Sequence, residues 1–219
     1  MKTKTLALIH TSATLVPVFQ TLCQEYLPQV QTFNMVDDSL IKDVIAKGEL
    51  TPATAKRVVN QVASAEQAGA DFILVTCSSI GKAVETAATL SAVPVIRVDL
   101  AMADEAVNQG KKIGVIATLP TTLEPTADLV QRRAQTAGKD IVLISKLCEG
   151  AFEALMGGQP EKHDKMVSDA LKELSKEVDV ILLAQASMAR VVDQLPDEDK
   201  KVPILSSPGT AIKYLSKLI

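Results

Sequence analysis

Two halves of the chain repeat the same landmarks at a nearly constant separation, and this repeat constrains the fold more than any other feature. The matching pairs lie 108 residues apart, or 109 for the last, and are Lys4 and Lys112, Pro17 and Pro125, Pro52 and Pro160, Asp71 and Asp179, and Val93-Pro94 and Val202-Pro203. Isolated echoes of this kind occur in any chain that alternates strands and helices, but chance echoes would not keep one offset across four separated positions. The sequence therefore predicts two equivalent lobes.

Short apolar runs alternate with longer amphipathic stretches in both halves. The run Phe72–Val75 is apolar without alternation, which is typical of a strand buried on both faces of a parallel sheet. Strands that alternate with helices indicate parallel sheets and right-handed crossovers. We expect an α/β fold of two pseudo-symmetric lobes, each a parallel sheet flanked by helices, with an active site in the cleft between the lobes. The expected lobes are residues 1–98 with 206–219, and residues 99–205.

The boundaries of individual elements follow from apolar runs, capping residues and glycines. Thr11-Ser12 is expected to cap the first helix, and Thr51-Pro52 to open the third. Strands are expected at 5–9, 29–35, 72–75, 95–98, 112–117, 140–145, 180–183 and 204–205, and helices at 15–26, 39–46, 52–69, 82–90, 102–108, 121–137, 152–156, 160–178, 187–195 and 209–218.

Charge and composition argue against several classes of function. The 23 Lys and Arg residues against 26 Asp and Glu residues give a net charge of −3, which offers no basic surface for nucleic acid or anionic lipid. No apolar run approaches the roughly 18 residues of a membrane span, and the first one is too short for a signal peptide. The three cysteines are far apart, so neither a disulfide framework nor a zinc site is expected. A reducing cytoplasm fits this cysteine usage.

The strongest candidate for chemistry is the polar segment that follows the Phe72–Val75 run. Thr76, Cys77, Ser78 and Ser79 come directly after the predicted strand and before a predicted helix. Ligands of open α/β sheets bind just beyond the carboxyl ends of the strands. A thiol flanked by hydroxyl groups at this point is a candidate catalytic group, and its pKa should be lowered by helix N–H groups or a neighbouring cation. The alternative is a small buried cysteine without a catalytic role.

Comparing the halves shows what replaces these residues in the second lobe. At the 108-residue offset, Gln185 corresponds to Cys77, and Thr118 corresponds to His10. Because His10 directly follows the first predicted strand, it is placed to interact with Cys77 after the adjacent strand, either as a catalytic partner or as a structural histidine. The first lobe thus presents an acid–base pair and the second presents amide and hydroxyl groups.

At these positions the chain resembles the aspartate/glutamate racemase superfamily, which is cofactor-independent. Val75-Thr76-Cys77-Ser78-Ser79 resembles the first cysteine motif of that superfamily, and Leu183-Ala184-Gln185-Ala186-Ser187 lies where the second cysteine motif belongs. The segment from Ile9 to Ser12 lies where many members have Asp-Ser-Gly. The resemblance covers essentially the whole chain. It implies an isomerase that needs no pyridoxal phosphate or metal, acts on a small carboxylate or amino acid, and forms a homodimer.

The family mechanism implies two thiols on opposite faces of an α-carbon, and this chain departs from it at Gln185. An amide cannot exchange a proton near neutral pH. The superfamily also contains decarboxylases and cis–trans isomerases with a different cysteine complement, which remain alternatives. A further alternative, from a different functional class, is a non-catalytic protein that binds small carboxylates.

Several other residues have both a functional and a structural interpretation. Hydroxyl and amide groups at helix starts are candidate ligands of a substrate carboxylate or candidate caps, and they are Thr11, Ser12, Ser78, Ser79, Thr118, Gln185 and Ser187. Cys148 and Glu149 follow a predicted strand and are interpreted as loop residues. Cys23 is assigned to the core with Phe19, and His163, among charged neighbours, to a solvated helix start.

Overall fold

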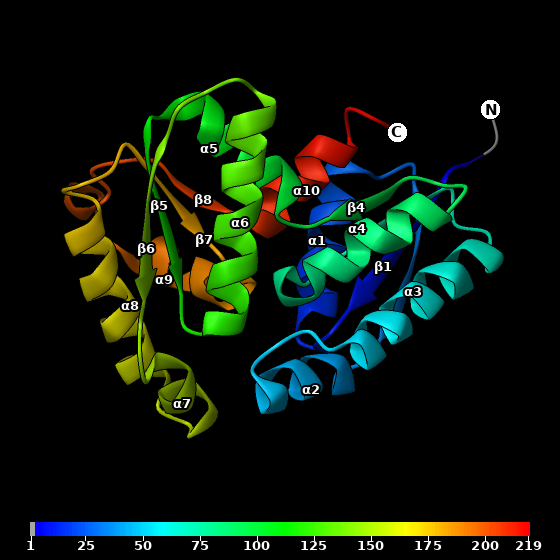
Figure 1. Ribbon diagram of the computed structural model, residues 1–219, viewed down its shortest axis with the longest axis horizontal. Coiled ribbons are helices and arrows are strands. Elements are labelled where there is room, and N and C mark those ends of the chain that lie inside the picture. The colour runs from blue at the N-terminus through cyan, green and yellow to red at the C-terminus, as the bar shows by residue number, and fades with distance from the viewer. Residues whose placement is uncertain (1–2) are drawn as a thin grey trace. The chain divides into compact units, whose positions relative to one another are not determined.

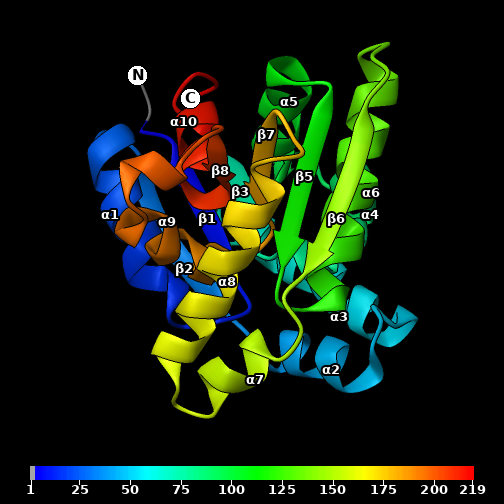
Figure 2. The ribbon, with the colours of Figure 1, turned by 90° about the vertical axis from the view of Figure 1, so that its left-hand side faces the viewer.

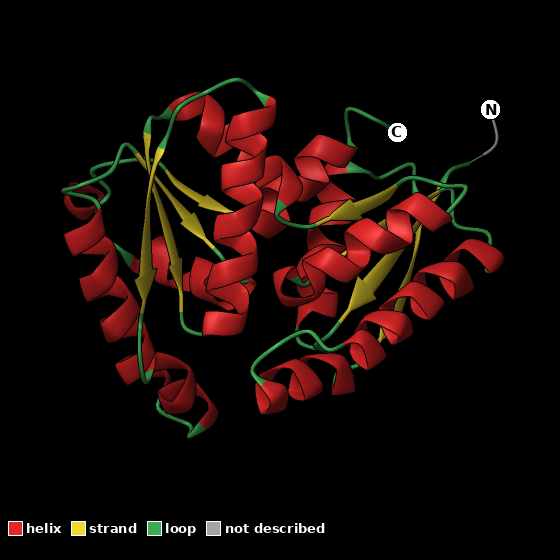
Figure 3. Cartoon of the chain, in the orientation of Figure 1, coloured by secondary structure: helices red, strands yellow, loops and turns green. Residues whose placement is uncertain are grey.

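The computed structural model describes residues 3–219, which form two compact units. One unit contains the chain up to Leu100 together with Pro208–Ile219, and the other is Ala101–Ser207. Each unit contains one four-stranded sheet in which all strands are parallel. Figure 3 shows helices flanking the strands of each sheet. The predicted α/β class with two parallel sheets is confirmed.

The first sheet contains β1 (Thr5–His10), β2 (Gln31–Val36), β3 (Phe72–Val75) and β4 (Val95–Arg97) in the order β2-β1-β3-β4. Its two central strands, β1 and β3, are buried along almost their whole length. This burial explains why their sequences are apolar without alternation.

Helices cover both faces of the first sheet (Figure 1). On one face α2 (Ser39–Lys47), α3 (Pro52–Gln67) and α4 (Gly81–Leu90) pack in a core that includes Ile9 and Val75. On the other face α1 (Leu15–Tyr26) and α10 (Ser207–Leu215) pack in a core that includes Leu8 and Phe19. Successive side chains of each strand therefore enter different cores.

The second sheet repeats this topology. It contains β5 (Lys112–Ala117), β6 (Val142–Leu147), β7 (Val180–Leu183) and β8 (Ile204–Ser206) in the order β6-β5-β7-β8, and β5 and β6 run side by side in Figure 2. Its helices are α5 (Leu100–Gln109), α6 (Pro120–Thr136), α7 (Ala151–Met156), α8 (Pro160–Leu174) and α9 (Ala189–Gln194). Short 3-10 turns, η1 (Ser78–Ile80), η2 (Ala186–Met188) and η3 (Asp197–Asp199), complete the fold.

The two units exchange one helix each along the chain. Helix α5 follows β4 of the first sheet but belongs almost wholly to the second unit, and α10 follows β8 of the second sheet but belongs to the first unit. Arg133 of α6 holds α5 through Asp104, with 2.5 Å between Nε and Oδ1. In the first unit, Ile212 of α10 is fully buried in the core that contains Phe19.

Three local expectations need correction. Thr11-Ser12 does not cap α1, whose N-cap residue is Thr14 without a side-chain capping bond, because the Ser12 hydroxyl is bonded to that of Thr14 at 2.8 Å. Helix α6 begins at Pro120, one residue before the expected start, since a proline is well tolerated in the first turn. Helix α8 ends at Leu174, four residues earlier than expected. The predicted cap of α3 is confirmed: the backbone N–H of Thr54 donates to the Thr51 hydroxyl at 3.2 Å.

The strand register corrects the offset between the two halves. Leu6 pairs with Phe72 in the first sheet, and Ile113 pairs with Val180 in the second. The first strands are therefore related by 107 residues (113 − 6) and the third strands by 108 (180 − 72). This one-residue difference matches His10 with Ala117, and Thr11 with Thr118, instead of His10 with Thr118.

Within residues 3–219, no helix combines the length and the apolar character needed to cross a bilayer.

Candidate active site

Cys77 lies where the chain leaves the end of β3. Its backbone is still extended, with φ −133° and ψ 117°, and the chain then turns at once into η1 and α4. This change from strand to helical backbone directs the N–H groups of Ser79 and Ile80 towards the Cys77 side chain, to which both are hydrogen-bonded. The sequence correctly predicted the strand, the turn and the helix at this motif, although α4 begins at Gly81.

Four hydrogen-bond donors surround the Cys77 thiol. They are the hydroxyls of Thr11 and Ser79 and the backbone N–H groups of Ser79 and Ile80. Burial nevertheless has the larger effect and raises the pKa of the thiol, while these hydrogen bonds oppose the rise. The expected lowering of the pKa is thus wrong. Its thiol is held protonated, with donors in place to stabilise a thiolate.

His10 has other partners than the cysteine expected for it. Its Nδ1 lies 2.9 Å from Thr76 Oγ1 and its Nε2 lies 2.9 Å from Asn34 Oδ1. Its ring is 5.6 Å from that of Phe19, centroid to centroid. Phe19 belongs to the core on one face of the sheet, whereas Cys77 packs against the core on the other face. The direct contact between His10 and Cys77 expected from adjacent strands is therefore replaced by a contact between His10 and Thr76.

Burial lowers the pKa of His10, and the hydrogen bond with Asn34 partly offsets this effect. The side chain is fully buried, so the neutral imidazole is the stable form. Because an amide oxygen only accepts, Nε2 carries the proton and donates to Asn34. Nδ1 then accepts from the Thr76 hydroxyl, whose single hydrogen is shared with the Ile9 carbonyl at 3.2 Å. In this arrangement His10 supports the residue before Cys77.

The second unit reproduces the same strand-end geometry around Gln185. Gln185 has φ −127° and ψ 133° and precedes η2 and α9, as Cys77 precedes η1 and α4. Its Oε1 accepts from the backbone N–H of Thr118 at 2.6 Å and from the Thr118 hydroxyl at 2.9 Å. Thr118 is the register equivalent of Thr11. The same pair of positions therefore holds a thiol in one unit and an amide oxygen in the other.

The remaining hydroxyl groups differ in exposure. Thr11, Ser78, Ser79 and Thr118 are buried, Ser12 and Gln185 are partly exposed, and Ser187 is exposed. In the first unit, Thr11 and Ser79 contact the thiol directly. Among residues 3–219 there is no group of three or more His, Cys, Asp or Glu side chains placed to bind a metal ion.

Two cysteines and one histidine lie away from these motifs. Cys23 and Cys148 are buried, and burial raises the pKa of each thiol to about 11. The core assignment of Cys23 is confirmed, and Glu149 is exposed. His163 is not solvated as expected but fully buried, with Nδ1 2.7 Å from Asp164 Oδ1. Its charged sequence neighbours concealed this burial because α8 turns only one face to the core.

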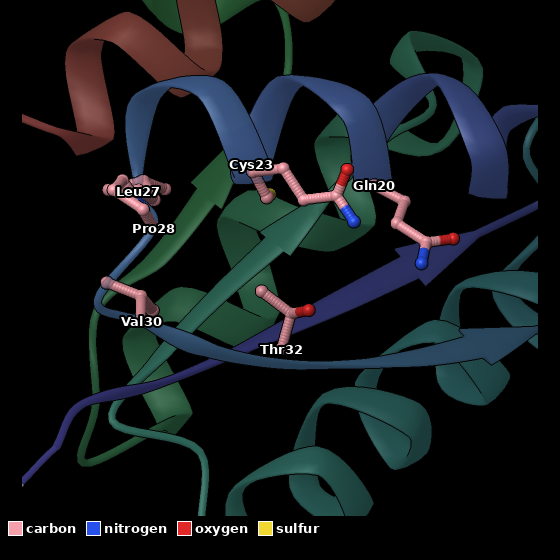
Figure 4. Close-up of a pocket in the computed structure, with 7 residues that line it drawn as sticks. Gln20, Cys23, Leu27, Pro28, Val30 and Thr32 are labelled. Carbon is pink, nitrogen blue, oxygen red and sulfur yellow. The ribbon is translucent and has the colours of Figure 1, made fainter.

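A pocket of about 210 Å³ lies at the other end of the first unit, between α1 and β2 (Figure 4). It is lined by Gln20, Cys23, Gln24, Leu27, Pro28, Val30 and Thr32. These residues come from the last turns of α1 and the start of β2. The pocket is thus distinct from the strand ends that carry Cys77.

Comparison with known proteins identifies the family of the chain. A family model described as Asp/Glu/Hydantoin racemase matches residues 7–215. The chain belongs to this racemase family. No curated protein matches the sequence. The predicted resemblance is confirmed, and membership places the protein among racemase-type isomerases.

Solved structures of the racemase family have the same fold at low sequence identity. A candidate Asp/Glu racemase from Yersinia pestis has a TM-score of 0.78 at 18% identity, with 98% of each chain covered. Glutamate racemase from Bacillus anthracis has a TM-score of 0.73 at 18% identity, over 100% of this chain and 82% of that one. Allantoin racemase from Klebsiella pneumoniae has a TM-score of 0.67 at 20% identity, over 99% and 87%.

Proposed function

We propose that this racemase-family protein is a cofactor-independent enzyme that moves a proton at the α-carbon of a small amino acid or carboxylate through Cys77. The observation that carries the proposal is the set of four donors around the thiol. A structural cysteine in an apolar core needs no such donors, and no hydrogen bond opposes the effect of burial on the pKa of Cys23 or Cys148.

The proposed step is a proton transfer between sulfur and carbon. The Cys77 thiolate accepts the α-proton, so that the C–H bond breaks and an S–H bond forms. The electron pair of the broken bond remains on the substrate as an enolate-like anion. Hydrogen bonds to sulfur from Thr11, Ser79 and Ile80 stabilise the thiolate form of the enzyme. The reverse transfer returns the proton and restores the thiolate.

The substrate carboxylate is proposed to bind at the same strand ends. The first turn after Cys77 presents backbone N–H groups and the hydroxyls of Ser78 and Ser79, and Ser12 adds a partly exposed hydroxyl after β1. Such donors suit a carboxylate group. In the second unit, Gln185 Oε1 already accepts two hydrogen bonds from Thr118. The NH₂ group of Gln185 and the hydroxyl of Ser187 are therefore the proposed donors for a substrate.

One thiol instead of two has a chemical consequence. Two-thiol racemisation needs an exchangeable proton at both equivalent positions, and the amide of Gln185 has none near neutral pH. We therefore propose that proton exchange at the α-carbon is faster than inversion of its configuration.

Decarboxylation is a second candidate reaction, and the raised pKa of Cys77 favours it. In this reaction the bond between the α-carbon and one carboxyl group breaks and CO₂ leaves. The electron pair stays on the α-carbon as an enolate-like anion, which then takes its proton from the neutral thiol. A single protonated thiol is sufficient for this step. Its substrates would carry two carboxylates on one carbon.

Protection of Cys77 from alkylation tests the proposed function and finds the substrate class. The protein is treated with iodoacetamide in the presence of single amino acids, dicarboxylic acids or geminal diacids, and labelling of each cysteine is measured by mass spectrometry. A substrate should slow labelling of Cys77. Labelling that no compound slows, together with no proton exchange or CO₂ release, would contradict the proposal. Protection without turnover would instead identify a carboxylate-binding protein.

A further inference from the structure

We propose that Arg97 is a positioning residue that fixes the loop around the Cys77 thiol. The proposal rests on the proposed function of that thiol. Arg97 is the last residue of β4 and pairs with Val75 on the neighbouring strand, two residues before Cys77. It is only 5% exposed, which is unusual for an arginine unless its charge is paired.

Two carboxylates hold the Arg97 guanidinium in one orientation. Nε lies 2.9 Å from Asp99 Oδ1 and Nη2 lies 2.7 Å from Asp99 Oδ2, which is a two-pronged pair with a fully buried carboxylate. Nη1 lies 2.5 Å from Oε1 of Glu85, which is on α4. This geometry restricts the guanidinium plane.

The guanidinium lies against the main chain of Gly81, the first residue of α4. A Cβ atom added to Gly81 would lie 2.3 Å from Cζ of Arg97, far inside van der Waals contact. Gly81 directly follows Ile80, whose N–H group reaches the thiol. Arg97, Asp99, Glu85 and Gly81, here called the Arg97 clamp, thus fix the start of α4 on the Cys77 side.

The second unit has the same fold but not the clamp. In the first unit Val75 pairs with Arg97. Leu183 of β7 is the equivalent of Val75, and it pairs with Ser206. Ser206 therefore stands where the first unit has Arg97. The first residue of α9, equivalent to Gly81, is Ala189. The fold therefore does not require the clamp, which accompanies the thiol and is missing where Gln185 replaces it.

The clamp acts through the backbone and not through the charge of Arg97. The pKa of Cys77 responds to burial and to hydrogen bonds from Thr11, Ser79 and Ile80. The Arg97 charge is offset by two carboxylates. Moving the start of α4 would lengthen the hydrogen bonds from Ser79 and Ile80 and weaken their stabilisation of the thiolate.

The test is the pH dependence of Cys77 alkylation in the full-length protein, followed by mass spectrometry. Gly81→Ala keeps every charge but displaces the guanidinium, and Glu85→Ala removes the acceptor through which Arg97 holds α4. Both variants should raise the pH midpoint of alkylation by about one unit, a tenfold lower thiolate fraction at a given pH. The control is Gly209→Ala, because nothing lies within 4 Å of a Cβ added there. It should keep the wild-type midpoint.

Arg97→Lys separates position from charge, since lysine keeps the charge but lacks the planar fork. It should also raise the midpoint. A wild-type midpoint in Arg97→Lys and Glu85→Ala would overturn the proposal, even if Gly81→Ala fails to fold. The midpoint needs no substrate. A shifted midpoint in a protein without turnover would therefore uphold the clamp and reject the proposed function.

Discussion

Thr118 donates two hydrogen bonds to the amide oxygen of Gln185, and its register equivalent Thr11 donates to the thiol of Cys77. The duplicated fold thus keeps one threonine at each first-strand end to orient the side chain at the third-strand end. What differs is the atom that the threonine holds. One atom can exchange a proton and the other cannot, and this difference underlies the proposed reaction.

Replacing Thr11 should weaken the thiolate of Cys77. Thr11→Val keeps the shape of the side chain but removes its hydroxyl donor, so the pKa of Cys77, already raised by burial, should rise further. The measurement is the pH midpoint of Cys77 alkylation. Thr86→Val is a matched control, because this threonine is exposed on α4 and its hydroxyl donates to the Lys82 carbonyl. Equal midpoints in the two variants would show that Thr11 does not act on the thiol.

Replacing Thr118 should affect the second unit in a different way. Thr118→Val removes one of the two donors to Gln185 Oε1 and leaves the backbone N–H in place. We expect a loss of about 1 kcal/mol in the free energy of unfolding, measured by urea denaturation. The pH midpoint of Cys77 alkylation should stay unchanged, and a shift of that midpoint would contradict separate roles for the two threonines.

The buried His10 should make the protein less stable in acid. Because burial lowers its pKa in the folded state, the unfolded chain binds a proton below about pH 6.5 that the folded chain binds only at lower pH. The free energy of unfolding should therefore fall as pH drops from 7 to 5, with a slope of at most about 1.4 kcal/mol per pH unit from this group. His10→Gln should flatten this dependence. An identical pH dependence in both proteins would rule out a neutral buried His10.

Alkylation of the native protein at pH 8 should be confined to Cys77. Burial raises the pKa of all three thiols, so access decides: Cys23 and Cys148 are only 4% and 5% exposed, whereas Cys77 is partly exposed. Mass spectrometry of peptides after brief iodoacetamide treatment measures the labelling of each cysteine. Labelling of Cys23 or Cys148 at a rate similar to that of Cys77 would contradict the packing described for these residues.

The sequence predicted the sheets because buried parallel strands leave apolar runs, and the repeat predicted that Cys77 and Gln185 are equivalent. It could not give the partners of these residues. Within the first sheet Ile9 pairs with Val75, so His10 lies beside Thr76 and Thr11 lies beside Cys77; a shift of one residue in this register would exchange the two. The role of Arg97 depends on how its side chain turns back onto Gly81, and no local pattern encodes that contact. The burial of His163 is likewise set by how α8 packs.

The central claim is that Cys77 carries a proton to and from the α-carbon of a small carboxylate or amino acid. Its most direct test is incorporation of deuterium from D₂O into the compounds that protect Cys77 from alkylation. For diacids that lose CO₂, deuterium is measured in the decarboxylated product. Wild-type protein and the control Cys23→Ala should incorporate deuterium, with exchange faster than inversion, and Cys77→Ala should be slower by about 100-fold or more. Incorporation by Cys77→Ala at the wild-type rate would contradict the account.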